Sequence, residues 1–311
     1  MPAEAPNRPE GRALLALVLV QLCFGSFPAF GKIAMREVSP FVVAAFRAAT
    51  GVAVLGLLAH GRARREPPLA AREHAELFGL ALLGIVGNQV LFISGLHRST
   101  ATNAALISAT IPVFTLALAA LAGIDRPSAR RLVGVPVALS GALLLMDFAR
   151  VDLSSRTFAG DVMLVVNCLS YAGFLVASRG ILRRRDSLVV TAWLFRYGAL
   201  PILALALPDL LRFRPAEISG AAWVSVAGIL AFPTVVAYTL NVWALARTGP
   251  STAALFVYLQ PLVAAALAWQ VLGERPGPRT GLSALLIFAG LALATWPGRR
   301  PQSSGSGRPS P

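Results

Sequence analysis

Apolar stretches, each about as long as a membrane span, alternate with short polar segments along the whole chain. Crossing a bilayer as an α-helix takes roughly 20 apolar residues, and the charge-free run from Ser99 to Ile124 exceeds that length. The pattern predicts spans near residues 13–33, 39–59, 76–96, 100–122, 130–147, 160–179, 188–207, 219–243, 249–271 and 279–296. We therefore expect an all-α integral membrane protein with ten transmembrane helices.

The second half of the chain repeats the first at a constant offset of 149 positions. The run NAAL at 103–106 aligns with TAAL at 252–255, and Phe46-Arg47 aligns with Phe195-Arg196. Because five spans is an odd number, the second copy has to enter the bilayer upside down relative to the first. Two inverted five-helix repeats are the architecture of many secondary transporters, in which exchange of conformations between the halves opens a central site to either side.

The repeat predicts a division of the chain into five parts. They are a cytoplasmic N-terminal segment (1–12), a first repeat (13–147), a connecting loop (148–159), a second repeat (160–296) and a cytoplasmic tail (297–311). The Ser, Gly and Pro content of the tail predicts disorder. Arg8 and Arg12 precede the first apolar stretch as in a signal peptide, but the nine spans that follow favour an uncleaved helix.

Composition excludes a water-soluble domain. Of the 311 residues, 56% are hydrophobic and 14% charged, whereas about 25% is usual for charged residues. The net charge of +14 comes from arginines clustered between apolar runs and not along one helical face, so nucleic acid is not expected as a partner. With both termini cytoplasmic, 17 Lys and Arg lie inside and 9 outside, which favours that orientation in the cytoplasmic (inner) membrane.

Two motifs resemble a known family. The third and fourth helices of EamA-type members of the drug/metabolite transporter superfamily resemble the stretch from Asn88 to Gly123, NQVLFISGLHRSTATNAALISATIPVFTLALAALAG. The ninth helix of that family is similar to the stretch from Tyr258 to Pro276, YLQPLVAAALAWQVLGERP. The resemblance spans essentially residues 13 to 296. It implies a ten-helix, inverted-repeat carrier of small metabolites, often an exporter, with a cavity lined mainly by helices 1, 3, 4, 6, 8 and 9.

Arg47 and Arg196 are the only ionisable residues predicted deep within a span, and they occupy equivalent repeat positions. A charge inside the bilayer is costly, so such residues are candidates for function. Binding of a substrate anion is one interpretation. The other is structural, because each Arg lies roughly 12 Å into its helix and is close enough to reach the headgroups or to hold helix-end carbonyls.

Uncharged polar residues provide most of the candidate binding site. Amides and phenols form hydrogen bonds with amino or carboxyl groups without carrying a permanent charge. The candidate substrate-binding residues are Asn88, Asn103, Asn167, Tyr171, Tyr238, Asn241, Tyr258 and Gln260. The alternative is that these side chains bond across helix interfaces and serve packing.

Matched prolines and charged pairs are candidates for moving parts. Pro112 and Pro261 lie mid-span at equivalent positions, where each removes a backbone hydrogen bond. They are candidate hinges, and a static kink is the alternative. The pairs at the ends of the fourth and ninth helices are expected to brace loops or to act as gates; they are Asp125, Arg126, Glu274 and Arg275.

The charge distribution limits the mechanism. No Asp or Glu is predicted mid-span, which disfavours proton-coupled export of organic cations. We predict a secondary transporter that moves a small polar organic metabolite, an amino acid or similar, by alternating access, as an exporter or exchanger. A membrane receptor or scaffold built from the same helices is the alternative.

Other classes of chemistry find no support in the residues. Cys23 and Cys168 lie inside apolar runs without a partner at metal-ligand spacing, so neither a metal nor a cofactor is expected. No protease helix motif or hydrolase elbow occurs, so we do not expect an enzyme. The expected partners are a small-molecule metabolite and the lipid bilayer. A second copy of the chain, forming a homodimer, is a further candidate partner.

Overall fold

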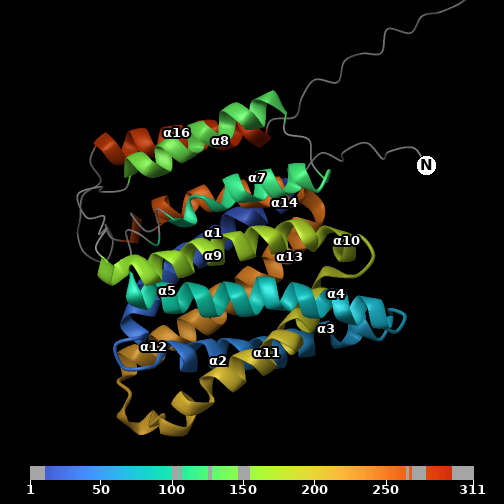
Figure 1. The fold of residues 1–311 in the computed structure, drawn as a ribbon, viewed down its shortest axis with the longest axis vertical. Coiled ribbons are helices and arrows are strands. Elements are labelled where there is room, and N and C mark those ends of the chain that lie inside the picture. The colour runs from blue at the N-terminus through green and yellow to red at the C-terminus, as the bar shows by residue number, and fades with distance from the viewer. Residues whose placement is uncertain are drawn as a thin grey trace, which may run out of the picture.

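The computed structural model describes residues 11–99, 104, 107–124, 128–145, 155–263, 266–267 and 278–295. Helices joined by short turns make up these residues, and no strand occurs among them. Figure 1 shows the helices stacked side by side, with their long axes close to one common direction. The all-α class is therefore confirmed for the described part of the chain.

Each half of the chain contributes a comparable series of helices. The first half forms α1 (Gly11–Ala34), α2 (Pro40–Thr50), η1 (Gly51–Leu55), α3 (Gly56–Ala63), α4 (Ala71–Ala81), η2 (Leu82–Leu91), α5 (Phe92–Arg98), α7 (Ile111–Leu121) and α8 (Ala129–Leu145). The second half forms α9 (Ser155–Ala177), α10 (Arg179–Leu182), α11 (Ser187–Arg212), η4 (Pro215–Glu217), α12 (Gly220–Ile229), η5 (Leu230–Val236), α13 (Ala237–Thr248), α14 (Pro250–Leu255), η6 (Phe256–Leu259) and α16 (Pro278–Thr295). The segments η1, η2 and η5 are π-helical, and η4 and η6 are 3-10 helices.

Short polar residues set the starts of several helices. The hydroxyl oxygen of Ser39 accepts the backbone N–H of Phe41 at 3.3 Å at the start of α2, and the Asp186 carboxylate accepts the N–H of Leu188 at 2.8 Å at the start of α11. Such N-caps satisfy N–H groups that the first turn of a helix leaves free. Gly249, with φ of 83°, separates α13 from α14 in a conformation that glycine adopts readily.

Several helical runs have the length and composition of membrane spans. Five of them within the described residues are long and apolar enough: Pro40–Ala63, Ala71–Arg98, Thr157–Leu182, Ser187–Arg212 and Gly220–Thr248. Shorter apolar helices cover Gly11–Phe27, Ile111–Leu121 and Gly281–Thr295. Several of the predicted spans are thus present as long apolar helices, as expected of a multi-pass membrane protein.

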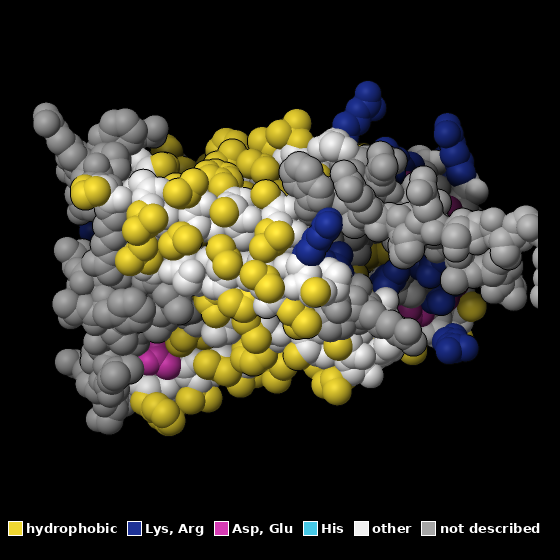
Figure 2. All heavy atoms as spheres, turned by 90° about the horizontal axis from the view of Figure 1, so that it is seen from above, with side chains coloured by type: hydrophobic (Ala, Val, Ile, Leu, Met, Phe, Trp, Pro, Cys, Tyr) yellow, Lys and Arg dark blue, Asp and Glu magenta, His cyan; other side chains and the backbone are white. Residues whose placement is uncertain are grey.

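The outer surface suits lipid. Leu57, Leu121 and Leu211 are 77%, 85% and 79% exposed, an arrangement that would be unfavourable in water. Figure 2 shows hydrophobic side chains spread over the middle of one face, with Lys and Arg gathered toward one end. The distribution matches a bundle with an apolar middle and a basic end.

The observed helix α11 is longer than its predicted span. The sequence predicts an end near residue 207, just before Pro208, but the helix continues to Arg212 and contains both Pro201 and Pro208. Neighbouring helices can satisfy the carbonyls that a proline frees, so prolines are tolerated inside helices of membrane proteins.

Helices at equivalent repeat positions pack on one another. Figure 1 shows α8 beside α16 at one edge of the molecule, and α2 packs on α11 near the opposite edge. A Cβ placed on Gly134 would lie 2.7 Å from the carbonyl oxygen of Gly290, and one placed on Gly141 would lie 2.9 Å from the carbonyl oxygen of Ser283. These contacts are equivalent under the 149-residue offset, and their order along the chain shows that α8 and α16 run antiparallel.

Candidate functional site

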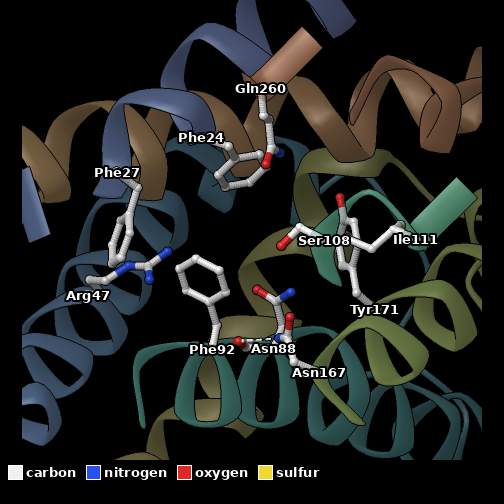
Figure 3. A pocket seen from close by; sticks show the side chains of 10 residues that line it. All are labelled: Phe24, Phe27, Arg47, Asn88, Phe92, Ser108, Ile111, Asn167, Tyr171 and Gln260. Carbon is white, nitrogen blue, oxygen red and sulfur yellow. Dashed lines mark hydrogen bonds between the residues drawn. The ribbon is translucent and has the colours of Figure 1, made fainter. Parts of the chain in front are cut away.

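A cavity lies between helices of the two repeats. Its walls come from α1, α2, η2, α5 and α7 in the first half, and from α9 and the residue after η6 in the second. The empty volume enclosed by its walls, counted together with the part that opens to solvent, is about 550 Å³. Figure 3 draws the lining side chains, which are Phe24, Phe27, Arg47, Asn88, Phe92, Ser108, Ile111, Asn167, Tyr171 and Gln260.

Arg47 supplies the charge of this cavity. Its side chain, on α2, is buried with 4% exposure. The Nε–H donates to the Thr234 hydroxyl oxygen at 3.0 Å, and the guanidinium carbon lies 4.9 Å from the centre of the Phe27 ring, within range of a cation–π interaction. Figure 3 shows the guanidinium tip directed into the space between Phe27 and Phe92.

The hydroxyl that holds Arg47 is oriented by an irregularity in the backbone. Pro233 has no N–H, so the carbonyl of Ile229, four residues earlier, loses its helical partner. The Thr234 hydroxyl donates to that carbonyl at 2.9 Å. Since the hydroxyl proton is used there, an oxygen lone pair is left for Arg47. The π-helical segment η5 thus makes an acceptor for a buried cation, and such segments often occur at functional sites.

Asn88 connects both repeats at the floor of the cavity. Its side-chain oxygen accepts the hydroxyl of Tyr238 at 3.1 Å, and its backbone carbonyl accepts the amide of Asn167 at 2.8 Å. The next residue, Gln89, is fully buried near the Tyr238 hydroxyl, but neither of its polar side-chain atoms makes a hydrogen bond of normal geometry. The two bonds to Asn88 therefore join the π-helical η2 of the first repeat to α9 and α13 of the second.

Two further pairs hold polar groups in place. The Asn241 amide donates to the Tyr171 hydroxyl at 3.0 Å, and the Gln260 amide donates to the side-chain oxygen of Gln21 at 2.8 Å. Of the predicted binding residues, four therefore line the cavity, namely Asn88, Asn167, Tyr171 and Gln260. Tyr238 and Asn241 lie behind this layer and support it.

Other predicted residues lie elsewhere. Arg196 is exposed, stacks over Trp193 at 4.9 Å and borders a depression between α3 and α11. Tyr258 is fully buried, and its hydroxyl has no hydrogen-bond partner. Five candidates lie outside the described residues: Asn103, Asp125, Arg126, Glu274 and Arg275.

The two predicted hinge prolines follow breaks in their helices. Pro112 is in the first turn of α7, directly after the turn at Ala109 and Thr110. Pro261 comes shortly after the 3-10 segment η6. Residues 256–259 of η6 are equivalent to residues 107–110 of the first repeat, which include the turn before Pro112. Each proline thus marks a place where regular α-helix is interrupted, and the interruption recurs in both repeats.

The aromatic wall of the cavity was not predicted from the sequence. Phe24, Phe27 and Phe92 look like ordinary lipid-facing or core residues in an apolar span. A usable signal exists in the repeat, because the equivalent second-half residues are Gly173, Val176 and Asn241. All three positions differ between the copies, and Phe27 against Val176 is one such difference.

Ion pairs join the two repeats at one end of the bundle. The Nε–H of Arg185 donates to Glu73 at 2.9 Å and one Nη donates to the other carboxylate oxygen at 2.6 Å. The hydrogen bonds that Arg185 donates to Glu73 raise the pKa of Arg185. Arg62 also pairs with Asp186 at 3.3 Å.

The opposite end is joined by different chemistry. The Glu37 carboxylate accepts the backbone N–H and the hydroxyl of Ser219 at 2.7 and 2.8 Å. These two bonds lower the pKa of the Glu37 carboxyl group. The hydroxyl of Ser39 donates to Asp209 nearby. Contacts between a carboxylate and a hydroxyl thus take the place that Arg–Glu pairs hold at the other end.

The fold and the cavity define a class: a helical, multi-pass membrane protein with a chamber of polar and aromatic side chains between two repeats. The profile of the EamA-like transporter family matches residues 11–147 and, a second time, residues 158–296. The chain belongs to the EamA-like transporter family, and the predicted membership in the drug/metabolite transporter superfamily is confirmed.

Relatives agree with this assignment. The chain is 27% identical to a WAT1-related protein of Arabidopsis thaliana, covering 92% of this chain and 82% of the relative. It is 28% identical to an uncharacterized transporter of Archaeoglobus fulgidus, covering 91% and 96%. An uncharacterized inner membrane transporter of Escherichia coli, YedA, is 26% identical, covering 90% and 89%. The protein is thus a membrane transporter of this family and not an enzyme.

The fold itself recurs in a solved structure. A protein crystal structure aligns with a TM-score of 0.75 at 20% identity, covering 92% of this chain and 97% of that one. The described helices therefore have a known spatial arrangement.

Proposed function

We propose that the protein is a secondary transporter that moves a small polar organic metabolite across the cytoplasmic membrane by alternating access, as an exporter or exchanger. The observation that carries the proposal is the cavity between the repeats, where Arg47 and Asn88 of the first half face Asn167 and Gln260 of the second. A site shared between two halves changes its access when the halves move relative to each other. A site within one half would not.

The antiparallel packing of α8 on α16 supports two inverted five-helix repeats and hence ten spans. The helices α8 and α16 are equivalent in the two repeats and pack antiparallel, through equivalent contacts at Gly134 and Gly141. Two such helices are related by a twofold axis that is perpendicular to the helix axes. Applied to the whole repeat, this axis lies in the membrane plane. The operation inverts the second copy, as the odd number of predicted spans requires.

Interrupted helices provide the moving parts in this proposal. The breaks before Pro112 and Pro261 occur at equivalent positions, next to the cavity residues Ile111 and Gln260. Helix interruptions lack some regular backbone bonds and can bend at lower cost. We expect Pro112→Ala to slow turnover more than it weakens binding, and unchanged turnover in this variant would contradict the hinge.

The ends of the bundle provide the gates. The Arg185–Glu73 pairs join the halves at one end and the Glu37–Ser219 bonds join them at the other. Each alternating-access state requires one of these sets to open. Positive residues concentrate on the cytoplasmic side of membrane proteins, so we place the Arg185 end, and both termini, in the cytoplasm.

Flux in membrane vesicles tests the function. Uptake and efflux of a mixed metabolite pool, with and without imposed gradients, identifies the solute class, the direction and the coupling. We expect Tyr238→Phe and Gln260→Ala to reduce flux while membrane insertion stays intact, because each removes a bond that orients a cavity residue. Normal kinetics in both variants would remove them from the site.

A receptor or scaffold with the same fold is the alternative, and solvent access to the cavity separates the two. In a background with Cys23 and Cys168 replaced, cysteines at Asn88 and Ser108 should react with a membrane-impermeant thiol reagent from both sides of the membrane. A cysteine at the fully buried Leu17 serves as the unreactive control. Protection of both cavity positions from both sides would favour a scaffold.

A further inference from the structure

The cavity contains a buried cation whose charge is not balanced by any carboxylate among its described lining residues. The Arg185–Glu73 and Arg62–Asp186 pairs lie at one end of the bundle and do not involve Arg47. We propose that the cavity binds a monoanionic organic carboxylate, with the carboxylate paired to Arg47 and an apolar body packed between the phenylalanines. The inference rests on the proposed function and specifies the substrate class of the same site.

Thr234 and the nearby Tyr238 hydroxyl account for only part of the donors of Arg47. A guanidinium carries five N–H donors in a planar fork that matches a carboxylate with two parallel bonds. The Nε–H is used by Thr234, which fixes the plane and rotation of the group. Figure 3 shows the tip directed into the cavity, away from its own helix. The side chain is therefore positioned for an incoming acceptor before any acceptor arrives.

The remainder of the cavity fits the rest of such a molecule. Phe27 and Phe92 present aromatic surface next to the guanidinium, and Phe24 lies beside Gln260, as Figure 3 shows. Asn88 and Asn167 lie beyond Phe92, on the side away from Arg47. A ligand with a carboxylate at one end, an apolar middle and a hydroxyl or carbonyl at the other end meets a matching group at each point.

The same lining disfavours a zwitterion. An α-ammonium group attached one carbon from the carboxylate would lie close to Arg47, and like charges repel. No Asp or Glu among the described lining residues is available to receive that ammonium group. A net negative charge on the ligand is the arrangement that balances this chamber.

Binding to the full-length protein, purified in detergent, tests the inference without requiring transport. The probes are matched pairs of an acid and its neutral amide, 3-phenyllactate with 3-phenyllactamide and benzoate with benzamide, together with the zwitterion phenylalanine. Affinity is measured by microscale thermophoresis and by ligand-induced thermal stabilisation. We expect at least one acid to bind roughly tenfold or more tightly than its amide, because charge-assisted bonds to a guanidinium are strong, and to bind more tightly than phenylalanine.

Substitutions of Arg47 test whether this residue causes the preference for acids over amides. Arg47→Gln should reduce the acid-to-amide preference to within about twofold, and Arg47→Lys should keep part of it because the charge stays but the fork is lost. Arg196→Gln, which changes the exposed equivalent outside the cavity, is the control and should keep the full preference. Equal affinity of acids and amides in the wild-type protein would overturn the inference, even if Arg47→Gln does not fold. Failure of every acid to bind, or full preference in Arg47→Gln, would also overturn it.

The two proposals fail in different ways. Acid binding without flux of the bound acid in proteoliposomes would leave the anion site standing and remove the carrier function. Flux of neutral or zwitterionic solutes with no preference for acids over amides would leave the carrier standing and remove the anion site.

Discussion

Arg47 and Arg196 occupy equivalent positions in the two repeats but end up in different surroundings. Arg47 is buried, bonded to Thr234 and stacked on Phe27 inside the cavity. Arg196 is exposed at the edge of α11 and stacks on Trp193. Duplication thus supplied two copies of the same cation, and only the first is part of the chamber between the halves.

The hydrogen-bond acceptor of Arg47 comes from the opposite repeat, and this explains the difference. The residue equivalent to Thr234 in the first half is Ile85, which has no hydroxyl and lies in the core. Pro233, which frees the carbonyl that orients Thr234, corresponds to Gly84. The first repeat therefore lacks both parts of the acceptor that the second repeat offers. The lesson is that the symmetry of the backbone persists while the site is built from the positions at which the copies differ.

The largest expected effect separates the two arginines directly. Arg47→Gln should lower solute flux in vesicles by about tenfold or more, because bonds to a charged group contribute about 1.5–3 kcal/mol. Arg196→Gln should stay within about twofold of wild type, because surface changes away from a site have small effects. Flux is compared at equal amounts of inserted protein. Similar losses in both variants would show that the copies are functionally equivalent.

The second effect tests the acceptor of Arg47. Thr234→Val keeps the shape of the side chain but removes the acceptor of the Arg47 Nε–H and the hydroxyl bond to the Ile229 carbonyl. We expect a loss of about 2 to 3 kcal/mol in the free energy of unfolding, measured as a lower Tm in detergent. Thr234→Ser retains the hydroxyl and should remain close to wild type. A Tm for Thr234→Val equal to that of Thr234→Ser would contradict the role of the hydroxyl.

The third effect tests where the two repeats remain alike. A Cβ on Gly141 would lie 2.9 Å from the backbone of Ile287, and one on Gly290 would lie 2.7 Å from the Gly134 carbonyl. Gly141→Ala and Gly290→Ala should each cost about 1–3 kcal/mol through overpacking. Gly281→Ala, with no atom within 4 Å of the added carbon, is the control and should not destabilise. Clearly unequal costs at Gly141 and Gly290 would show that the α8–α16 pair is not symmetric.

The smallest effect concerns the end closed by Glu37. Hydrogen bonds from Ser219 lower the pKa of this carboxyl group in the folded protein, so its contribution to stability is present above the unfolded pKa near 4.5 and is lost as the pH falls through the lower folded value. Thermal unfolding of wild type and Glu37→Gln should therefore differ slightly at pH 7 and converge at low pH. A difference that persists unchanged into acid would show that the carboxylate charge is not involved.

Much of the helical layout could be predicted from the chain. The span predicted near 39–59 is observed as Pro40–Ala63, and the one near 219–243 as Gly220–Thr248, because continuous apolar runs of this length have few alternatives to a membrane helix. The π-helical segments were not predicted. The π-helical segment η5 surrounds Pro233, and nothing in the local hydropathy distinguishes it from regular α-helix.

The candidate site could be predicted in part. Asn88 and Gln260 were identified because amides in apolar spans are conspicuous, and both line the cavity. Phe27 was missed because an apolar side chain in an apolar span carries no signal of its own. Tyr258 was predicted to bind substrate, and the structure buries its hydroxyl without a partner.

Two properties of the molecule follow from the sequence alone. The length of the apolar runs determines residence in a membrane, and the 149-residue offset determines that the chain contains the same module twice. Both are properties of local pattern, which hydropathy and register record without any knowledge of contacts. Which of the two arginines faces the chamber was decided by tertiary structure. Arg47 meets a hydroxyl 187 residues away in the sequence, and the pairing exists only because packing of the repeats brings η5 against α2.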